Sequence, residues 1–460
     1  MVSSTVFECL RPYIDDFVGV CRALCMDPAG DVIIEGCLAM SGLADTSGDN
    51  LMHFCHDMGR SLFTAFSHRH AKVRMAGLKC LFSVMGCGIW KTSVYVLEGM
   101  VGFRDPNIVP IKDFYEPSTK LNYFALFVGD RSTVCRELFY VTMGKMLTSL
   151  PDKYDHEGRL FPYIISALYD DNDGICSTGF DILEEVGQLH ETENEEKLRE
   201  VKQFAYKNEW SLNGLIPDSE LKYPHPICQR PRLGARIMVR TYVRRYIKGL
   251  YVELGDWIEA SRLRCSNLLL FSTIYSEDYI TQFLDELLVS LYKVVIDKSN
   301  SDIAYNIKLT LRLIGRYCKP GAYQGLIISA MRNEVAAFYH FTQPGAIKSF
   351  GYLFWGSIEL LPELKYFGKV DDIFKDFIKA VDDVVVHGLD IQLATLLIDT
   401  VEEIMDAFML KRKEKDIDFK DFLAPHLRSL LIMTIRAQGV FNAFKLDNKD
   451  DPDTIIASKK

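Results

Sequence analysis

One apolar position recurs along the chain about every 40 to 45 residues, and this recurrence restricts the possible folds more than any other feature. At each recurrence, a β-branched residue or leucine is followed by a polar or small residue and then by small and apolar residues at helical spacing. The clearest copy is the segment 71–81, AKVRMAGLKCL. The predicted anchors are Val32, Val73, Val134, Ile175, Leu263, Ile303, Ile347 and Ile391, which lie 41, 61, 41, 88, 40, 44 and 44 residues apart.

A period of this length is that of HEAT repeats, in which each unit is a hairpin of two helices. Segments between the anchors support the pairing, because 280–295 and 370–384 each place apolar residues three and four apart on one face. No stretch alternates as a strand does. The sequence predicts an all-α fold, an α-solenoid of about eight HEAT-type hairpins with a capping hairpin at the C-terminal end. The interval of 88 residues has room for a further repeat, but we interpret it as one repeat plus an insertion.

Two irregular segments interrupt the predicted array. The first lies near 103–118 and contains three prolines, and the second is a loop rich in proline and aromatic residues at 206–232. The predicted organisation is N-terminal HEAT repeats over 1–205, the insertion loop 206–232, C-terminal repeats with the capping hairpin over 233–445, and a disordered tail at 446–460. The loop contains Trp210 and Tyr223, and its aromatic residues fit a packed brace and a recognition surface equally well.

The segment 233–272 is predicted to be one such hairpin. Its first helix carries Ile237, Tyr242 and Leu250 on the apolar face, and Gly255-Asp256 then breaks the chain, with Asp256 as the expected N-cap of a second helix. A row of cations lies on the opposite face of the first helix: Arg236, Arg240, Arg244 and Lys248, with Arg230, Arg232 and Arg245 nearby. No acidic residue occurs between 229 and 252. We interpret this row either as a docking face for an acidic segment of a partner or as a solvated face, with the acidic residues at 191–200 as possible internal partners.

The same region resembles a known family. The motifs are YPHP at 223–226, RPRLGAR at 230–236, and Asp256-Trp257 followed by Arg262-Leu263-Arg264, with LYDDND at 168–173 and ILEEVG at 182–187 upstream. They resemble the fifth of the dynein axonemal assembly factors, a HEAT-repeat family, over roughly 120–300. The resemblance implies a cytoplasmic factor for preassembly of axonemal dynein arms in ciliated cells, with dynein chains and chaperones or co-chaperones as partners.

Composition narrows the classes of function. Of the 460 residues, 48% are hydrophobic and 25% charged, which is typical of a globular protein. The net charge of −9 argues against a general nucleic-acid binder, since neutralising phosphates requires a basic surface. The 12 cysteines lie mostly in apolar helical patterns, which indicates a reducing compartment, and no apolar run is long enough to span a bilayer. A cytoplasmic protein with no membrane, nucleic-acid or small-molecule partner is expected.

Several histidine, cysteine and glutamate residues are candidates for a catalytic or metal site. Two His-Glu pairs, at 156–157 and 190–191, suggest the ligands of HEAT-repeat di-iron hydroxylases, but such an enzyme needs four pairs. We expect these two to be surface dipeptides at opposite ends of one hairpin. The group His53, Cys55, His56, His68 and His70, and the pair Cys21 and Cys25, are expected to be core cysteines and surface histidines. No cofactor, metal or catalytic residue is predicted.

A non-enzymatic scaffold or adaptor is therefore the predicted function. Another HEAT scaffold, such as a phosphatase regulatory subunit or a transport receptor of the importin type, is the first alternative, and a HEAT-repeat metalloenzyme is the second. An importin is expected to present regularly spaced tryptophan and asparagine residues on its inner helices. The four tryptophans, Trp90, Trp210, Trp257 and Trp355, occupy non-equivalent repeat positions, which disfavours that alternative.

Overall fold

The computed structural model describes residues 11–88, 91–101, 121–204, 222–297, 299–334, 340–359, 368–387, 390–415 and 423–447. All regular elements in these ranges are helices, as the sequence predicts. The chain divides into two compact units, 1–198 with 222–253 and 199–221 with 254–460. The predicted boundary lies at the loop 206–232, whereas the first unit also includes the two helices between 233 and 253.

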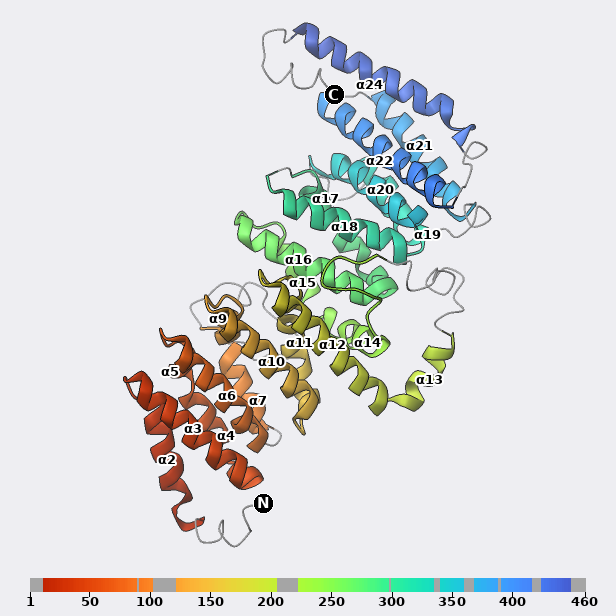
Figure 1. The fold of residues 1–460 in the computed structure, drawn as a ribbon. Coiled ribbons are helices and arrows are strands. Elements are labelled where there is room, and N and C mark those ends of the chain that lie inside the picture. Colours follow the sequence, from red (N-terminus) through yellow and green to blue (C-terminus); the bar gives the residue numbers. More distant parts are fainter. Residues whose placement is uncertain are drawn as a thin grey trace. The chain divides into compact units, whose positions relative to one another are not determined.

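The first unit contains α2 to α15. Its helices are α2 (Ile14–Cys25), α3 (Gly30–Ser47), α4 (Cys55–Ser61), α5 (Phe63–Phe66), α6 (Ala71–Cys87), α7 (Lys91–Val101), α9 (Tyr123–Val128), α10 (Thr133–Ser149), α11 (Lys153–Ser166), α12 (Asp173–Glu193), α14 (Leu233–Val243) and α15 (Ile247–Glu253), with short 3-10 turns at Arg11–Tyr13, Gly48–Leu51 and Ala167–Tyr169. Helix α13 (Glu195–Phe204) crosses the division at 198. The second helices α3, α6, α10, α12 and α14 pack successively against one another (Figure 1).

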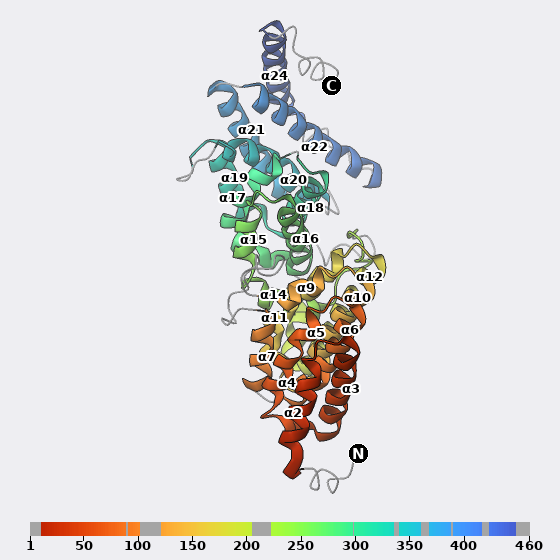
Figure 2. The ribbon, with the colours of Figure 1, turned by 90° about the vertical axis from the view of Figure 1, so that its left-hand side faces the viewer.

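The second unit repeats this arrangement. It consists of α16 (Glu259–Ser276), the 3-10 segment η6 (Glu277–Phe283), α17 (Leu284–Val295), α18 (Ser301–Tyr317), α19 (Pro320–Met331), α20 (Thr342–Glu359), α21 (Gly368–His387), α22 (Ile391–Lys415) and α24 (Leu427–Asp447). Helices α16, α18, α20 and α22 form one layer, and α17, α19 and α21 form the other. Figure 2 shows the two layers within each unit, which is the arrangement expected of stacked hairpins.

Local sequence explains where several helices begin and which face they bury. The side chains of Asn122, Asn172 and Asn300 accept hydrogen bonds from backbone N–H groups in the first turns of α9, α12 and α18, and so act as N-caps. In α17, four leucines at three- and four-residue spacing are buried, while the acidic residues of its first turn face solvent. Such amphipathic helices gain most of their stability by burying the apolar face against neighbouring hairpins.

The predicted anchors are confirmed at four positions and wrong at one. Val73, Ile175, Ile303 and Ile347 are buried, whereas Val32, Leu263 and Ile391 are only partly buried. Val134 is 56% exposed, and its neighbour Cys135 is fully buried in its place. Successive side chains on a helix point about 100° apart around its axis. Placing the anchor one residue too early in the repeat therefore exchanges a core position for a solvent-facing one.

The interval of 88 residues between Ile175 and Leu263 contains a further hairpin's second helix, which the anchor pattern did not predict. Helix α14 packs against α12 in the layer of second helices, so the prediction of a single repeat with an insertion is wrong. The buried residue at its third position is Ala235 instead of a β-branched residue or leucine, which explains why the pattern did not reveal it. The predicted first helix over 233–250 is also wrong, because α14 ends at Val243 and α15 begins at Ile247.

Candidate protein-interaction surface

The predicted row of cations does not lie on one helix face. A turn at 244–246 separates α14 from α15, so Arg236 and Arg240 belong to one helix and Lys248 to the next. Arg244 and Lys248 are exposed, Arg240 is partly buried, and Arg236 is only 8% exposed. The single basic face inferred from the four-residue spacing is therefore wrong, and its exposed part consists of Arg244 and Lys248 with Arg240 beside them.

Arg236 has a structural role that recurs in other repeats. Its Nε donates a hydrogen bond of 2.9 Å to the carbonyl oxygen of Pro231, in the loop before its own helix. An arginine at the same fourth helical position makes the same kind of contact elsewhere, with Nη1 of Arg74 donating to the carbonyl oxygen of His68 at 2.7 Å and Nη1 of Arg136 to that of Asp130 at 2.7 Å. Arg236 thus closes its own loop.

In three repeats this arginine also reaches the next repeat, forming what we call the Arg–Asp ladder. The shortest N···O distances are 2.6 Å for Arg74–Asp130, 2.8 Å for Arg136–Asp170 and 3.5 Å for Arg262–Asp297. Burial alone would raise the pKa of Asp130, but hydrogen bonds from Arg74 and from the backbone N–H of Ser132 outweigh it and lower that pKa. Sequence reasoning missed the ladder, although an aspartate six residues before an arginine marks two of these loops, at 130–136 and 256–262.

The ladder is interrupted between α12 and α14. Cys176 occupies the arginine position of α12, and Arg230 occupies the aspartate position of the loop before α14. Two carboxylates of α12 hold α14 instead: Glu184 accepts from the backbone N–H of Arg232 and Glu191 from that of Gly234, both at 2.9 Å. Glu191 also lies 3.5 Å from the Arg232 side chain, so part of the acidic segment 191–200 is an internal partner for an arginine beside the predicted row.

Arg245 faces the interior of the first unit. Its guanidinium carbon lies 4.9 Å from the centre of the Tyr242 ring, and the Tyr242 hydroxyl donates a hydrogen bond to Glu157 of α11. Added atoms at Gly158 would overlap the Arg245 guanidinium, which shows how closely the two pack. Tyr223 of the predicted surface is partly buried, and Trp210 lies outside the described residues.

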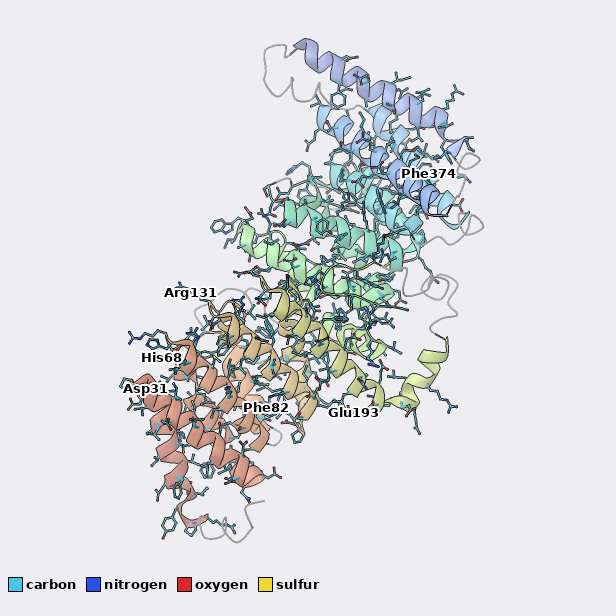
Figure 3. The ribbon with its side chains drawn as sticks, in the orientation of Figure 1. Asp31, His68, Phe82, Arg131, Glu193 and Phe374 are labelled. Carbon is cyan, nitrogen blue, oxygen red and sulfur yellow. The ribbon has the colours of Figure 1, made fainter. Side chains whose placement is uncertain are left out.

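The prediction that both His-Glu pairs lie on the surface is wrong for the first pair. His156 is fully buried, Glu157 is 6% exposed, and burial raises the pKa of Glu157. The pairs also lie at the same end of their hairpin, because α11 and α12 run antiparallel. The Lys153 ammonium pairs at 2.5 Å with Glu193, which Figure 3 labels at the end of α12. His190 and Glu191 are partly buried.

These groups belong to a polar network between helices. His156 Nε2 lies 3.2 Å from Asp152, whose other carboxylate oxygen accepts from Ser93 of α7, and Arg159 pairs with Glu98 at 3.1 Å. Within the ranges that the structure describes, no group of three or more histidine, cysteine, aspartate or glutamate side chains is arranged to hold a metal ion. The network joins α7, α11, α12 and α14.

The cysteine and histidine group is also dispersed. Cys21, Cys25 and Cys55 are buried, and the Cys25 sulfur lies 4.0 Å from that of Cys37. His53 and His70 are exposed, while His56 and His68 are partly exposed. His68 and His70 line a groove of about 630 Å³ between the loops before α3 and α6. Asp31, in the first turn of α3, lines it from the other side, and Figure 3 shows Asp31, His68 and Arg131 along one edge of the first unit.

In the second unit, a polar cluster that sequence reasoning missed joins α18, α20 and α22. The Arg312 guanidinium lies 3.7 Å from the centre of the Trp355 ring, a stacking distance. Glu403 of α22 accepts hydrogen bonds from Lys308 at 2.7 Å and Arg312 at 3.2 Å. One carboxylate thus links helices from alternate hairpins, and Trp355 has a packing role here.

No helix among the described residues is both long and apolar enough to cross a membrane. Comparison with known families gives two matches. A family model described as dynein axonemal assembly factor 5, HEAT-repeat domain, matches residues 222–339. A second, described as dynein axonemal assembly factor 5-like, TPR repeats, matches 1–100 and 121–201.

Curated relatives carry the same name. Dynein axonemal assembly factor 5 of Xenopus laevis is 25% identical over 339 residues, which cover 74% of this chain and 36% of the relative. The Homo sapiens protein of that name is 25% identical over 328 residues, covering 71% of this chain and 34% of the relative. The chain spans about a third of the length of the curated relatives that it matches.

Solved structures show only distant likeness. The Kap95:Nup1 complex matches with a TM-score of 0.27 and 10% identity, covering 96% of this chain and 64% of the other. A mutant of Kap121p gives a TM-score of 0.26 and 13% identity, covering 94% and 49%. Scores this low support no inference about this chain.

Proposed function

Because the chain belongs to the family of dynein axonemal assembly factor 5, we propose that it is a non-enzymatic HEAT-repeat scaffold in the preassembly of axonemal dynein arms. The observation that carries the proposal is the match to two models of this family, which together cover residues 1–100, 121–201 and 222–339. Stacked hairpins provide long surfaces on which partner proteins bind. A structural role for the His-Glu pairs supports the proposal, since Glu157 and Glu191 both accept hydrogen bonds from α14.

The proposed site of action is the cytoplasm, before the arms enter the cilium. The partners are dynein chains together with chaperones or co-chaperones. A scaffold would hold dynein chains during assembly without altering them chemically, so neither a cofactor nor a metal is required.

For docking, we propose the exposed basic surface of Arg240, Arg244 and Lys248. Two of these side chains are exposed, and the segment 230–250 contains no acidic residue. Such a surface attracts an acidic segment of a partner and raises the rate of encounter. Arg236 and Arg245 are omitted from the surface, since one closes its own loop and the other packs on Tyr242.

The test is affinity purification of the tagged chain from ciliated cells during regrowth of cilia, with mass spectrometry of captured proteins. Axonemal dynein chains should be enriched over a tag-only control. Removal of the chain should leave cilia without dynein arms, as seen in axonemal cross-sections. Intact arms in its absence, together with no captured dynein chain, would disprove the proposed function.

A further inference from the structure

Trp257 is the one residue of the Asp256-Trp257…Arg262 motif whose side chain the fold of the second unit does not use. Nη1 of Arg262 donates to the carbonyl oxygens of Asp256 at 3.1 Å and Trp257 at 3.4 Å, and Arg262 also pairs with Asp297. The Asp256 carboxylate accepts from the backbone N–H of Ile258 at 3.3 Å. The indole of Trp257, in contrast, is 86% exposed.

The equivalent positions of the ladder repeats at Arg74 and Arg136 are also exposed, but neither of them is a tryptophan. Trp257 lies five residues before its ladder arginine, Arg262. The residues five before Arg74 and Arg136 are Arg69 and Arg131, which are both exposed. A charged side chain suits a loop apex that faces water, whereas a large apolar one there loses the free energy of burial.

The loop backbone is fixed even though the indole is free of the core. Besides the two bonds from Arg262, Lys293 Nζ donates to the carbonyl oxygen of Gly255 at 3.4 Å. Gly255 and Ala260, the small residues on either side of this turn, are exposed as well. A tryptophan on a fixed backbone loses little conformational entropy on binding, and such residues dominate the energetics of protein interfaces.

We propose that Trp257 is an anchor that inserts into an apolar pocket on a protein partner. This inference rests on the proposed function, and of the partners proposed there we assign the anchor to an axonemal dynein chain, the partner that the descriptions of both matching family models name. Asp256 and Glu259 lie in the same turn, beside Lys293, so the loop carries charges of both signs and lacks the concentrated basic surface that a nucleic acid or an anionic membrane requires. The pocket on the partner therefore takes an indole.

The experiment uses the full chain and follows dynein heavy chain captured from an extract of ciliated cells. Trp257→Ser should reduce capture at least tenfold, and Trp257→Phe should restore part of it, because an aromatic ring still fills the pocket. Tyr305→Ser is the matched control, since Tyr305 is an aromatic residue of the same unit with 58% exposure, and it should leave capture unchanged. The melting temperatures of all variants should equal that of the wild type.

Each other result contradicts the inference in a different way. Equal capture by wild type and Trp257→Ser would disprove the anchor and leave the proposed function standing. No capture by the wild type would disprove the anchor, and together with intact dynein arms in the absence of the chain it would disprove the proposed function as well. A melting temperature lowered by several degrees would show that the indole packs within the fold. Cosedimentation with phosphatidylcholine–phosphatidylserine vesicles that depends on Trp257 would show a membrane contact instead.

Discussion

The α10–α12 and α12–α14 junctions join successive second helices of one unit by different chemistry. Arg136 and Asp170 link the first pair through two hydrogen bonds of 2.8 and 2.9 Å between guanidinium and carboxylate. At the second junction the carboxylates belong to α12 and accept from backbone N–H groups, and Gly187 and Gly234 allow the helices to touch. The first junction is therefore held by an ion pair of the Arg–Asp ladder, and the second requires glycine at the point where α12 and α14 touch.

The largest expected effect is loss of the ladder at the first junction. Asp170→Ala should lower the free energy of unfolding by about 3 kcal/mol, because Arg136 would remain largely buried without its carboxylate. Urea unfolding followed by circular dichroism measures the change. Asp57→Ala is the control, since the Arg22–Asp57 pair is 3.5 Å long and well exposed, and it should cost less than about 1 kcal/mol. Equal costs for the two variants would contradict the role given to the ladder.

A somewhat smaller effect is expected at the second junction. A Cβ atom at Gly234 would lie 2.0 Å from the carbonyl oxygen of Gly187, so Gly234→Ala must push α14 away from α12. We expect a loss of about 2 kcal/mol from this overpacking, measured in the same unfolding experiment. Gly42→Ala in α3 has open space around it and should stabilise the chain by about 0.5–1 kcal/mol. The junction would not depend on glycine if both variants shifted stability in the same direction.

The carboxylates of ladder and junction should also respond oppositely to pH. The pKa of Asp130 is lowered in the folded state, so its stabilisation is present above the unfolded value and is lost as pH falls through the folded one. Burial raises the pKa of Glu184 in the folded state. The free energy of unfolding therefore falls as pH rises from the pKa of Glu184 in the unfolded chain through its pKa in the folded chain.

Unfolding measured between pH 3 and 7 separates the two groups. Asp130→Asn should reduce the loss of stability on acidification, and Glu184→Gln should remove a loss that occurs as pH rises. Matched pH profiles for wild type and both variants would show that neither carboxylate contributes to the pH dependence.

Apolar periodicity in the sequence predicted the repeated hairpins. It did not predict features that depend on how two particular helices pack against each other. Apolar spacing identified the hairpins at Val73, Ile175, Ile303 and Ile347, because each repeat buries the same face. It failed at α14, where Ala235 fills the anchor position and Gly234 permits close packing, so the usual signal is absent.

The candidate sites show the same limit. Charge spacing placed Arg236 on a docking face, although its position in the repeat directs it to Pro231. From the sequence, the two His-Glu pairs were expected at opposite ends of the hairpin of α11 and α12. They lie at the same end, because the two helices run antiparallel. In both cases the chemistry of the residue was evident in the sequence, but its neighbours were fixed only by the tertiary packing.

The smallest effect on stability is expected at the exposed cations beside the second junction. The double variant Arg244→Glu/Lys248→Glu should change the free energy of unfolding by less than about 0.5 kcal/mol, since both side chains are exposed. Capture of dynein chains should nevertheless fall, and capture by the wild type should weaken as salt rises, because exposed charges are screened within about 10 Å at 0.1 M ionic strength. The matched control is Lys79→Glu/Lys145→Glu, which makes the same change in net charge at exposed positions of α6 and α10. If the control reduces capture as much as the test variant, the attraction comes from net charge, and the surface formed by Arg240, Arg244 and Lys248 has no specific role.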